Sequence, residues 1–164
     1  MTFKPTVLAA TIVALAAMLA APTLHAKTFR WSSASDIPTL DIHSQNNALG
    51  NGVHAAIYDA LVYYNSVTFK VEPQLATGWK EISPMQMRFT LRSGVRFSDG
   101  TALTAEDVVY SLTRAMAKTS NYAVFTQGID KVVKVDDTTI DIMMKAPNPV
   151  LLNQLTELRV MSKT

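Results

Sequence analysis

The sequence contains no cysteine among its 164 residues. This absence excludes a disulfide framework, a thiol nucleophile and a metal site built from cysteine ligands. It also excludes lipid attachment through an amino-terminal cysteine, so we expect no lipid anchor.

Glycine-based motifs of catalysis and nucleotide binding are missing as well. The chain has six glycines, and they form neither a phosphate-binding P-loop nor a G-x-S-x-G nucleophile elbow. Gly50 and Gly52 are not followed by a third glycine at the spacing of a dinucleotide-binding fold. We therefore expect no catalytic residue, no cofactor and a protein that is not an enzyme.

Charge of one sign is not in excess, because the net charge is +2 and charged residues make up 17% of the chain. This balance gives no indication of a nucleic-acid partner or of a polybasic membrane patch. The hydrophobic share of 48% is ordinary for one globular domain.

A long apolar run lies near the amino terminus, where Lys4 precedes the segment from Val7 to Ala21. The run has the length of a signal-peptide core and is short for a membrane span, which needs roughly 20 apolar residues. Ala26 offers a small residue before Lys27 for cleavage. Residues 1–26 are therefore predicted to be a cleaved signal peptide, and the alternative is an uncleaved amino-terminal anchor.

The stretch from Met87 to Met116 combines three local signals. Apolar residues alternate with polar ones from Met87 to Arg92, which is the period of a half-buried strand. Asp99-Gly100 is a tight-turn dipeptide. Thr104 and Asp107 have the spacing of a capping box at the start of an amphipathic helix. The pattern predicts a strand, a turn and a helix.

The amino-acid sequence of this stretch resembles the signature of extracellular solute-binding proteins of the peptide/nickel class, family 5. The residues that carry the resemblance are F-T-L-R-S-G-V-R-F-S-D-G-T-A-L-T-A-E-D-V-V-Y-S. The family pattern reads F-x-L-R-x-G-V-x-F-x-D-G-x-x-x-T-A-x-D-V-x-x-S, and the chain keeps each fixed position. The segments SASDIPTLDIHSQNN, YDALVYYN and PQLATGWK agree with the family too. The resemblance covers nearly everything after residue 26, but only the amino-terminal part of the family.

The resemblance implies an α/β fold of the periplasmic-binding-protein type (type II), in which two lobes close on a ligand. Residues 27–164 would be the amino-terminal portion of domain I, with a strand-rich subdomain over about residues 67–147. It also implies a periplasmic protein, monomeric when complete, that passes a peptide or similar solute to the permease subunits of an ABC importer. The ligand, whether peptide, nickel or sugar, is left open. A secreted hydrolase and an interaction or chaperone-like fragment are the alternatives.

Periodicity and turn residues predict further elements along the chain. The first elements are a strand over Thr28–Ala34, a polar loop over Ser35–Asn47, and a helix that Asn46 or Asn47 caps and that carries the apolar stripe Leu49, Val53, Ile57 and Leu61. A hairpin of Val62–Asn65 with Phe69–Val71 follows, and then a helical turn over Pro73–Trp79 with Trp79 packed inside. The last elements are a hairpin of Ile129–Val135 with Thr139–Lys145, a short helix with Asn148 as cap and Pro149 first, and a strand that begins at Arg159–Ser162.

Ligand-binding residues are expected in the polar loop that follows the first predicted strand. Ligands of open α/β sheets sit beyond the carboxyl ends of strands, and the next helix would offer free amides to a carboxylate. The loop also corresponds to the first, cleft-facing loop of the family that the chain resembles. We predict that Ser35, Asp36 and Asn46 bind the ligand, with Asp41 behind them; the alternative is that they only stabilise turns.

Two chemical alternatives for the same loop are weaker. Ser35, Asp36, Asp41 and His43 could form a hydrolytic set, but sequence neighbours seldom make a catalytic triad. Asp41, His43 and His54 could ligate a metal, but their spacing matches no metal-site template. We therefore predict neither a catalytic nor a metal site.

Overall fold

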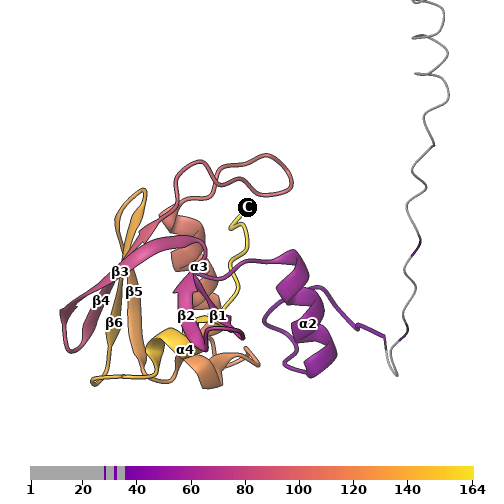
Figure 1. Cartoon of the computed structure of the whole chain (residues 1–164), viewed down its shortest axis with the longest axis horizontal. Helices are drawn as coiled ribbons and strands as arrows, with labels where there is room; N and C mark the ends of the chain where they lie inside the picture. Colours follow the sequence, from indigo (N-terminus) through magenta and orange to yellow (C-terminus); the bar gives the residue numbers. More distant parts are fainter. Residues whose placement is uncertain (1–27, 29–31, 33–35) are drawn as a thin grey trace, which may run out of the picture. The chain divides into compact units, whose positions relative to one another are not determined.

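The computed structural model describes Thr28, Ser32 and residues 36–164 (Figure 1). The predicted signal peptide, Ser35 and most of the predicted strand Thr28–Ala34 lie outside these residues. Within the described part of the chain, no helix is both long enough and apolar enough to cross a membrane.

The largest element is an antiparallel sheet of four strands in the order β3-β4-β6-β5. The strands are β3 (Ala76–Ser83), β4 (Gln86–Leu91), β5 (Ile129–Asp136) and β6 (Thr139–Met144). Phe89 lies opposite Ile140 and Met87 opposite Ile142. Because strand residues alternate between the two faces, these apolar pairs line one face of the sheet.

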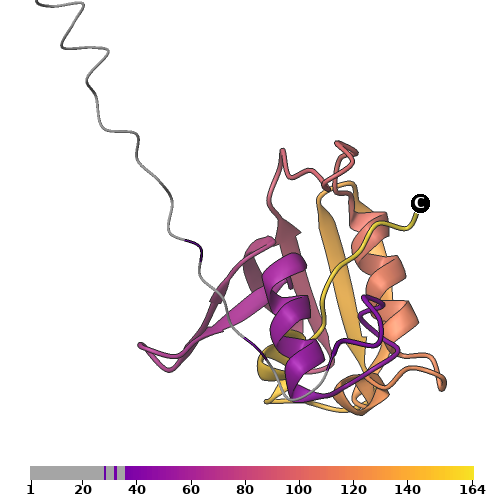
Figure 2. The same ribbon diagram turned by 90° about the vertical axis from the view of Figure 1, so that its right-hand side faces the viewer.

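Helix α3 (Ala105–Ala115) covers this apolar face by packing on β5 and β6, as Figure 2 also shows. The predicted turn before it is confirmed, since Gly100 has a φ of +88° that suits glycine. The predicted capping box is confirmed too. The carboxylate of Asp107 accepts hydrogen bonds from the amide and the hydroxyl of Thr104, at 2.9 and 2.7 Å.

The remaining elements lie outside this sheet. They are α2 (Ala48–Ile57), the antiparallel hairpin of β1 (Val62–Asn65) and β2 (Lys70–Pro73), the 3-10 turn η1 (Ala123–Thr126) and α4 (Leu151–Leu155). The two predicted hairpins are therefore confirmed, and the fold is mixed α/β as expected. The core consists of side chains from both sheets and from α3 and α4, among them Val62, Phe89, Leu112, Ile140, Ile142, Leu151 and Leu155.

The prediction of a helical turn over Pro73–Trp79 is wrong, because Trp79 lies in the middle of β3. It pairs with Phe89 of β4, and the two rings are 6.3 Å apart between centroids. The backbone hydrogen bonds of the β3–β4 ladder outweigh the local turn preference of this segment. Trp79 is half-buried at the edge of the core rather than fully inside it.

The predicted apolar stripe on α2 is also wrong. The helix ends at Ile57, which is 54% exposed, so Leu61 lies beyond it. The buried residues of the helix are Gly50 and His54. The helix therefore turns a small residue and a histidine inward, and tertiary packing overrides the hydrophobic periodicity.

Two predictions near the carboxyl terminus need correction. Helix α4 begins at Leu151, and Asn148 accepts a hydrogen bond from the Val150 amide at 3.2 Å instead of capping a helix that starts at Pro149. In the segment predicted as a strand from Arg159, the described backbone makes an isolated bridge with Ala60. A single bridge lacks the repeated pairing of a strand.

Candidate ligand-binding site

The loop that was predicted to bind a ligand runs along the surface before α2. Asp36 and Asn46 are exposed, whereas Asp41 is half-buried. Asp36 accepts a hydrogen bond from the next amide, that of Ile37, at 2.8 Å. Ser35 lies outside the described residues. The side chains of Asp36 and Asn46 are therefore accessible to solvent, whereas that of Asp41 is partly covered.

Asp41 fixes the loop to α3 through Arg114. Its two carboxylate oxygens accept hydrogen bonds from Nη1 and Nη2 of Arg114 at 2.7 and 2.6 Å. Asp41 also accepts the amide of His43 at 3.0 Å. The hydrogen bonds from Arg114 lower the pKa of Asp41 from 3.8 to about 2. A bidentate pair of this kind is strong and geometrically specific, so Asp41 acts as an anchor.

His43 is the second contact of Arg114 and is 3% exposed. Its Nδ1 lies 2.9 Å from Nη1 of Arg114. A guanidinium can only donate, so Nδ1 accepts and the ring proton of neutral His43 is on Nε2. Burial first, and then the charge of Arg114, lowers the pKa of His43 to about 4. His43 is therefore neutral near pH 7.

A second segment, residues 120–122, lies against the loop. The amide of Asn121 donates to the carbonyl of His43 at 3.0 Å, and its side chain donates to the carbonyl of Ser44. The ring of Tyr122 meets that of His43 edge-on, with centroids 5.9 Å apart. Two segments more than 70 residues apart in sequence thus form one surface.

Asn46 is oriented by a chain of side-chain hydrogen bonds. The hydroxyl of Tyr122 donates to Asn51 at 2.7 Å, and Asn51 donates to Asn46 at 2.9 Å. Asn46 in turn reaches the carbonyl of Asn121 at 3.4 Å. The side chain of Asn46 is therefore exposed, but these hydrogen bonds restrict the rotamers that it samples. This restriction reduces the conformational entropy lost when a ligand binds.

The start of α2 is only partly available to a ligand. Asn47 is the N-cap, and its side chain accepts the amide of Gly50 at 2.8 Å. The cap predicted at Asn46 or Asn47 is thus Asn47, and it occupies one of the amides that sequence reasoning offered to a ligand carboxylate.

A small hollow lies between the loop and the carboxyl end of α3, with a volume of about 130 Å³. It is lined by Asp41, His43, Ser44, Arg114, Ala117, Thr119 and Ser120. Enclosed sites for small ligands typically measure about 300–1,000 Å³. The hollow can therefore take one small group, and a larger ligand would need a second surface to enclose it.

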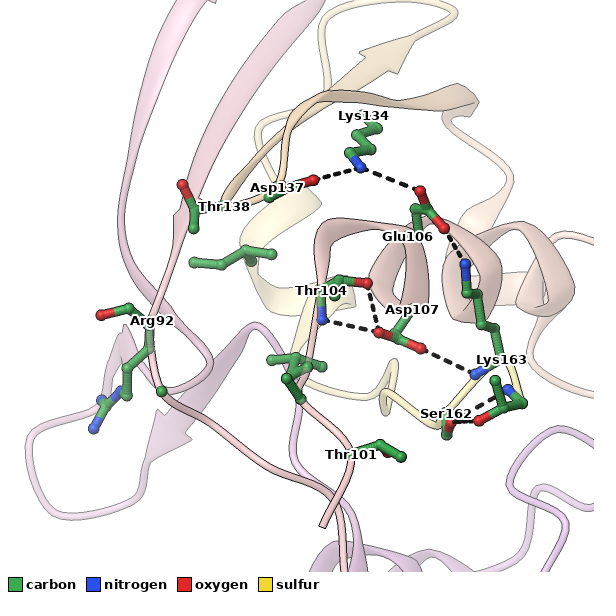
Figure 3. Close-up of a pocket in the computed structure, with 16 residues that line it drawn as sticks. Arg92, Thr101, Thr104, Glu106, Asp107, Lys134, Asp137, Thr138, Ser162 and Lys163 are labelled. Atoms are coloured by element: carbon green, nitrogen blue, oxygen red, sulfur yellow. Dashed lines mark hydrogen bonds and ion pairs between the residues drawn. The ribbon is translucent and has the colours of Figure 1, made fainter. Parts of the chain in front are cut away.

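A larger hollow of about 380 Å³ lies at the amino end of α3, and Figure 3 shows its lining. Lys134 bridges Asp137 and Glu106 at 2.6 and 3.2 Å, and Glu106 also pairs with Lys163. The guanidinium of Arg92 points away from these groups (Figure 3). Because the acidic and basic groups in this hollow neutralise one another, we take the loop as the candidate site.

Sequence reasoning missed the partners that hold the loop, namely Arg114, Asn121 and Tyr122. Arg114 is 73 residues from Asp41, so no local spacing connects them. A weak signal was available, since Arg114 falls in the last turn of a predicted helix and would carry its charge at a helix end. That signal identifies no partner. Within the described residues, no group of histidine, aspartate or glutamate side chains is arranged to hold a metal.

Comparison with known proteins gives a family match over most of the described chain. The family model of bacterial extracellular solute-binding proteins, family 5 (middle), matches residues 70–163. The glutathione-binding protein GsiB of Pectobacterium atrosepticum is 32% identical over 145 residues, which is 85% of this chain and 28% of GsiB. A transcriptional regulator of Escherichia coli, SgrR, is 33% identical over 102 residues, or 60% of this chain and 18% of SgrR.

Solved structures agree with the sequence matches. The periplasmic murein tripeptide-binding protein MppA of Escherichia coli superposes with a TM-score of 0.70 and 28% identity. The superposition covers 76% of this chain and 28% of MppA. The mixed α/β fold is thus that of periplasmic binding proteins, and the chain spans less than a third of the length of these relatives.

Proposed function

Because the chain belongs to the bacterial extracellular solute-binding proteins of family 5, we propose that it supplies part of the ligand-binding lobe of a periplasmic substrate-binding protein. Residues 27–164 correspond in this proposal to the amino-terminal portion of domain I. The protein binds a peptide or a similar small solute non-covalently and delivers it to the permease subunits of an ABC importer.

The observation that carries this proposal is the surface formed by the loop and residues 120–122. It combines exposed polar side chains with a fixed backbone, since Asn121 donates to two loop carbonyls. Fixed polar groups on an open surface suit reversible capture, because they are in place before the ligand arrives. In this proposal the small hollow beside them is the part of a two-lobed cleft that this chain contributes.

The polar groups of the loop suit a peptide. Asn46 offers both an amide donor and a carbonyl acceptor, as a peptide group requires, and the carboxylate of Asp36 can pair with a ligand ammonium. We propose that Ser35 completes this contact set and that Asp41 acts from behind. The names of GsiB and MppA record glutathione and a murein tripeptide as ligands, which supports a small peptide.

The match to the regulator SgrR raises a second candidate, a ligand-sensing part of a transcription factor. A regulator of transcription acts on DNA inside the cell. Residues 1–26 are instead predicted to direct export, and the net charge of +2 gives no indication of a DNA surface. These features favour the transport role.

Two measurements test the proposal. Mass spectrometry of a periplasmic extract should find a chain that begins at Lys27; an intact Met1 chain in the cytoplasm would favour the regulator. Saturation-transfer NMR of the purified chain with a mixture of di- to pentapeptides should then detect weak, millimolar binders, because one lobe encloses only half of the ligand.

The matched control for the peptide experiment is Asn46→Ala, which removes one proposed contact from an exposed position. Saturation transfer should fall several-fold in this variant. An equal signal from the variant and the parent chain, or no signal from any peptide at 10 mM (about ten times the expected dissociation constant), would refute the assignment of this loop.

A further inference from the structure

We propose that Arg114 is the positioning residue of the ligand loop. It holds residues 41–44 by donating to Asp41 and His43 at the same time, and this arrangement requires neutral His43 with its proton on Nε2. The inference rests on the proposed function for the purpose of the loop, but its geometry can be tested without any ligand.

The first step of the argument is that one guanidinium serves three acceptor atoms. Nη1 of Arg114 donates to Oδ1 of Asp41 at 2.7 Å and to Nδ1 of His43 at 2.9 Å, and Nη2 donates to Oδ2 of Asp41 at 2.6 Å. The sulfur of Met161 lies 3.8 Å from Nη1. A lysine ammonium could not reproduce this planar fork, so the site is specific for arginine.

The second step concerns the loop backbone that these two acceptors control. Asp41 also accepts the His43 amide at 3.0 Å, and its carbonyl accepts the amide and the hydroxyl of Ser44 at 3.3 and 3.0 Å. The carbonyls of His43 and Ser44 are the two that accept from Asn121. Arg114 therefore determines where the backbone before Asn46 lies.

The third step fixes the protonation state. The guanidinium of arginine has only N–H donors, so a proton on Nδ1 of His43 would place two donors opposite each other with no acceptor between them. The groups that face His43 are Arg114 from α3, Asp41 from the loop, His54 from α2 and the ring of Tyr122. Nε2 of His43 is buried and has no hydrogen-bond partner among the described residues. Protonating His43 would therefore displace Arg114 and release the loop.

A second bidentate pair in the chain shows what a purely structural role looks like. Arg88 of β4 donates to Asp141 of β6 at 2.7 and 2.8 Å. These residues lie directly opposite each other in a ladder that backbone hydrogen bonds already hold. Losing this pair lowers stability without moving a loop, which makes Arg88 the matched control for Arg114.

The experiment compares the parent chain with Arg114→Met and Arg88→Met, since methionine keeps an unbranched apolar stem and removes the donors. Amide hydrogen exchange is followed by NMR. In Arg114→Met, the amides of His43, Ser44 and Asn121 should exchange at least tenfold faster, while those of β6 stay unchanged. In Arg88→Met, these three amides should keep the exchange rate of the parent chain relative to global opening.

Nitrogen-15 shifts of the His43 ring give a reading that a general loss of stability would not produce. In the parent chain at pH 7, Nδ1 should be the unprotonated, hydrogen-bonded nitrogen, and Arg114→Met should remove that hydrogen bond. Arg114→Lys should restore loop protection only in part, because a single ammonium cannot reproduce the planar two-nitrogen fork of arginine.

Either of two results would overturn the inference. One is a parent chain whose His43 carries its proton on Nδ1, which needs no variant to observe. The other is equal acceleration of the loop amides in Arg114→Met and Arg88→Met. Both results are independent of peptide binding, so failure of the proposed function would be recognised separately.

Discussion

Two bidentate arginine–aspartate pairs with similar hydrogen-bond distances join different kinds of structure in this chain. The sheet pair, Arg88–Asp141, links neighbouring strands that a ladder of backbone hydrogen bonds already aligns. The loop pair, Arg114–Asp41, links a helix to a loop 73 residues away. In the sheet, the ion pair adds to an alignment that the backbone hydrogen bonds already provide. In the loop, we propose that the ion pair itself provides the alignment. The structural importance of an ion pair therefore depends on what else holds the two segments that it joins.

The largest effect should come from the sheet region, where stability rests on buried apolar area. Phe89 is fully buried between β3 and β6, and Phe89→Ala should lower the free energy of unfolding by about 3–5 kcal/mol. Urea denaturation followed by circular dichroism measures it. The half-buried Trp79 should cost less when changed to alanine. A loss below about 1 kcal/mol for Phe89→Ala would show that the core lies elsewhere.

The next effect, on acid stability, should come from the loop region. The pKa of His43 falls from 6.5 to about 4 on folding, so the unfolded chain binds the proton more tightly. Stability is then complete above pH 6.5 and decreases as the pH falls towards 4, by on the order of 3 kcal/mol. The pKa of Asp41 falls from 3.8 to about 2 on folding, so its own contribution to stability is lost mainly below pH 4, outside this window.

Urea denaturation at pH 7 and pH 4.5 measures this loss. His43→Gln is the control, because glutamine still offers an acceptor to Arg114 but does not titrate. The pH dependence should be smaller in His43→Gln than in the parent chain. Identical pH dependence in the two chains would exclude His43 as the source.

A smaller loss of stability is expected for a change at the start of α3, the helix that packs on the sheet and also carries Arg114. Asp107→Ala removes the capping box with Thr104 and the acceptor for the Lys163 amide. The cost should be about 1 kcal/mol, as for other lost N-caps. Thermal unfolding measures it, and exchange of the His43 amide relative to global opening should not change. Selective exposure of that amide would mean that the two ends of α3 are not independent.

The smallest stability effect should come from the exposed residues of the loop. Asp36→Ala and Asn46→Ala should each change the free energy of unfolding by less than about 0.5 kcal/mol, because both side chains are exposed. Peptide binding should nevertheless weaken. A stability loss above 1 kcal/mol in either variant (about a fivefold change in the folding equilibrium) would support the alternative that these residues only stabilise turns.

Local patterns predicted the parts of the fold that local physics determines. The alternation from Met87 to Leu91, the turn at Gly100 and the cap at Thr104 each depend on neighbours within a few residues. Trp79 was misassigned because its strand is defined by pairing with Phe89, a partner that periodicity in its own segment does not reveal.

The candidate site was predictable only in outline. Polar and turn-forming residues identified the loop, and the predicted helix cap at Asn46 or Asn47 is found at Asn47, because both signals are local. The contact between buried His43 and Arg114 joins the loop to α3, 71 residues further along the chain. Such contacts are set by tertiary packing, and no spacing within the loop encodes them.

The most direct test of the account is a nitrogen-15 NMR titration of this chain with a short peptide such as trialanine. The loop account predicts that the amide signals of Ser44, Asn46 and Asn121 shift together and reach one common dissociation constant. The signals around Thr104 and Lys134, which line the hollow at the start of α3, should stay in place. Shifts confined to that hollow, with the loop signals unmoved, would contradict the account.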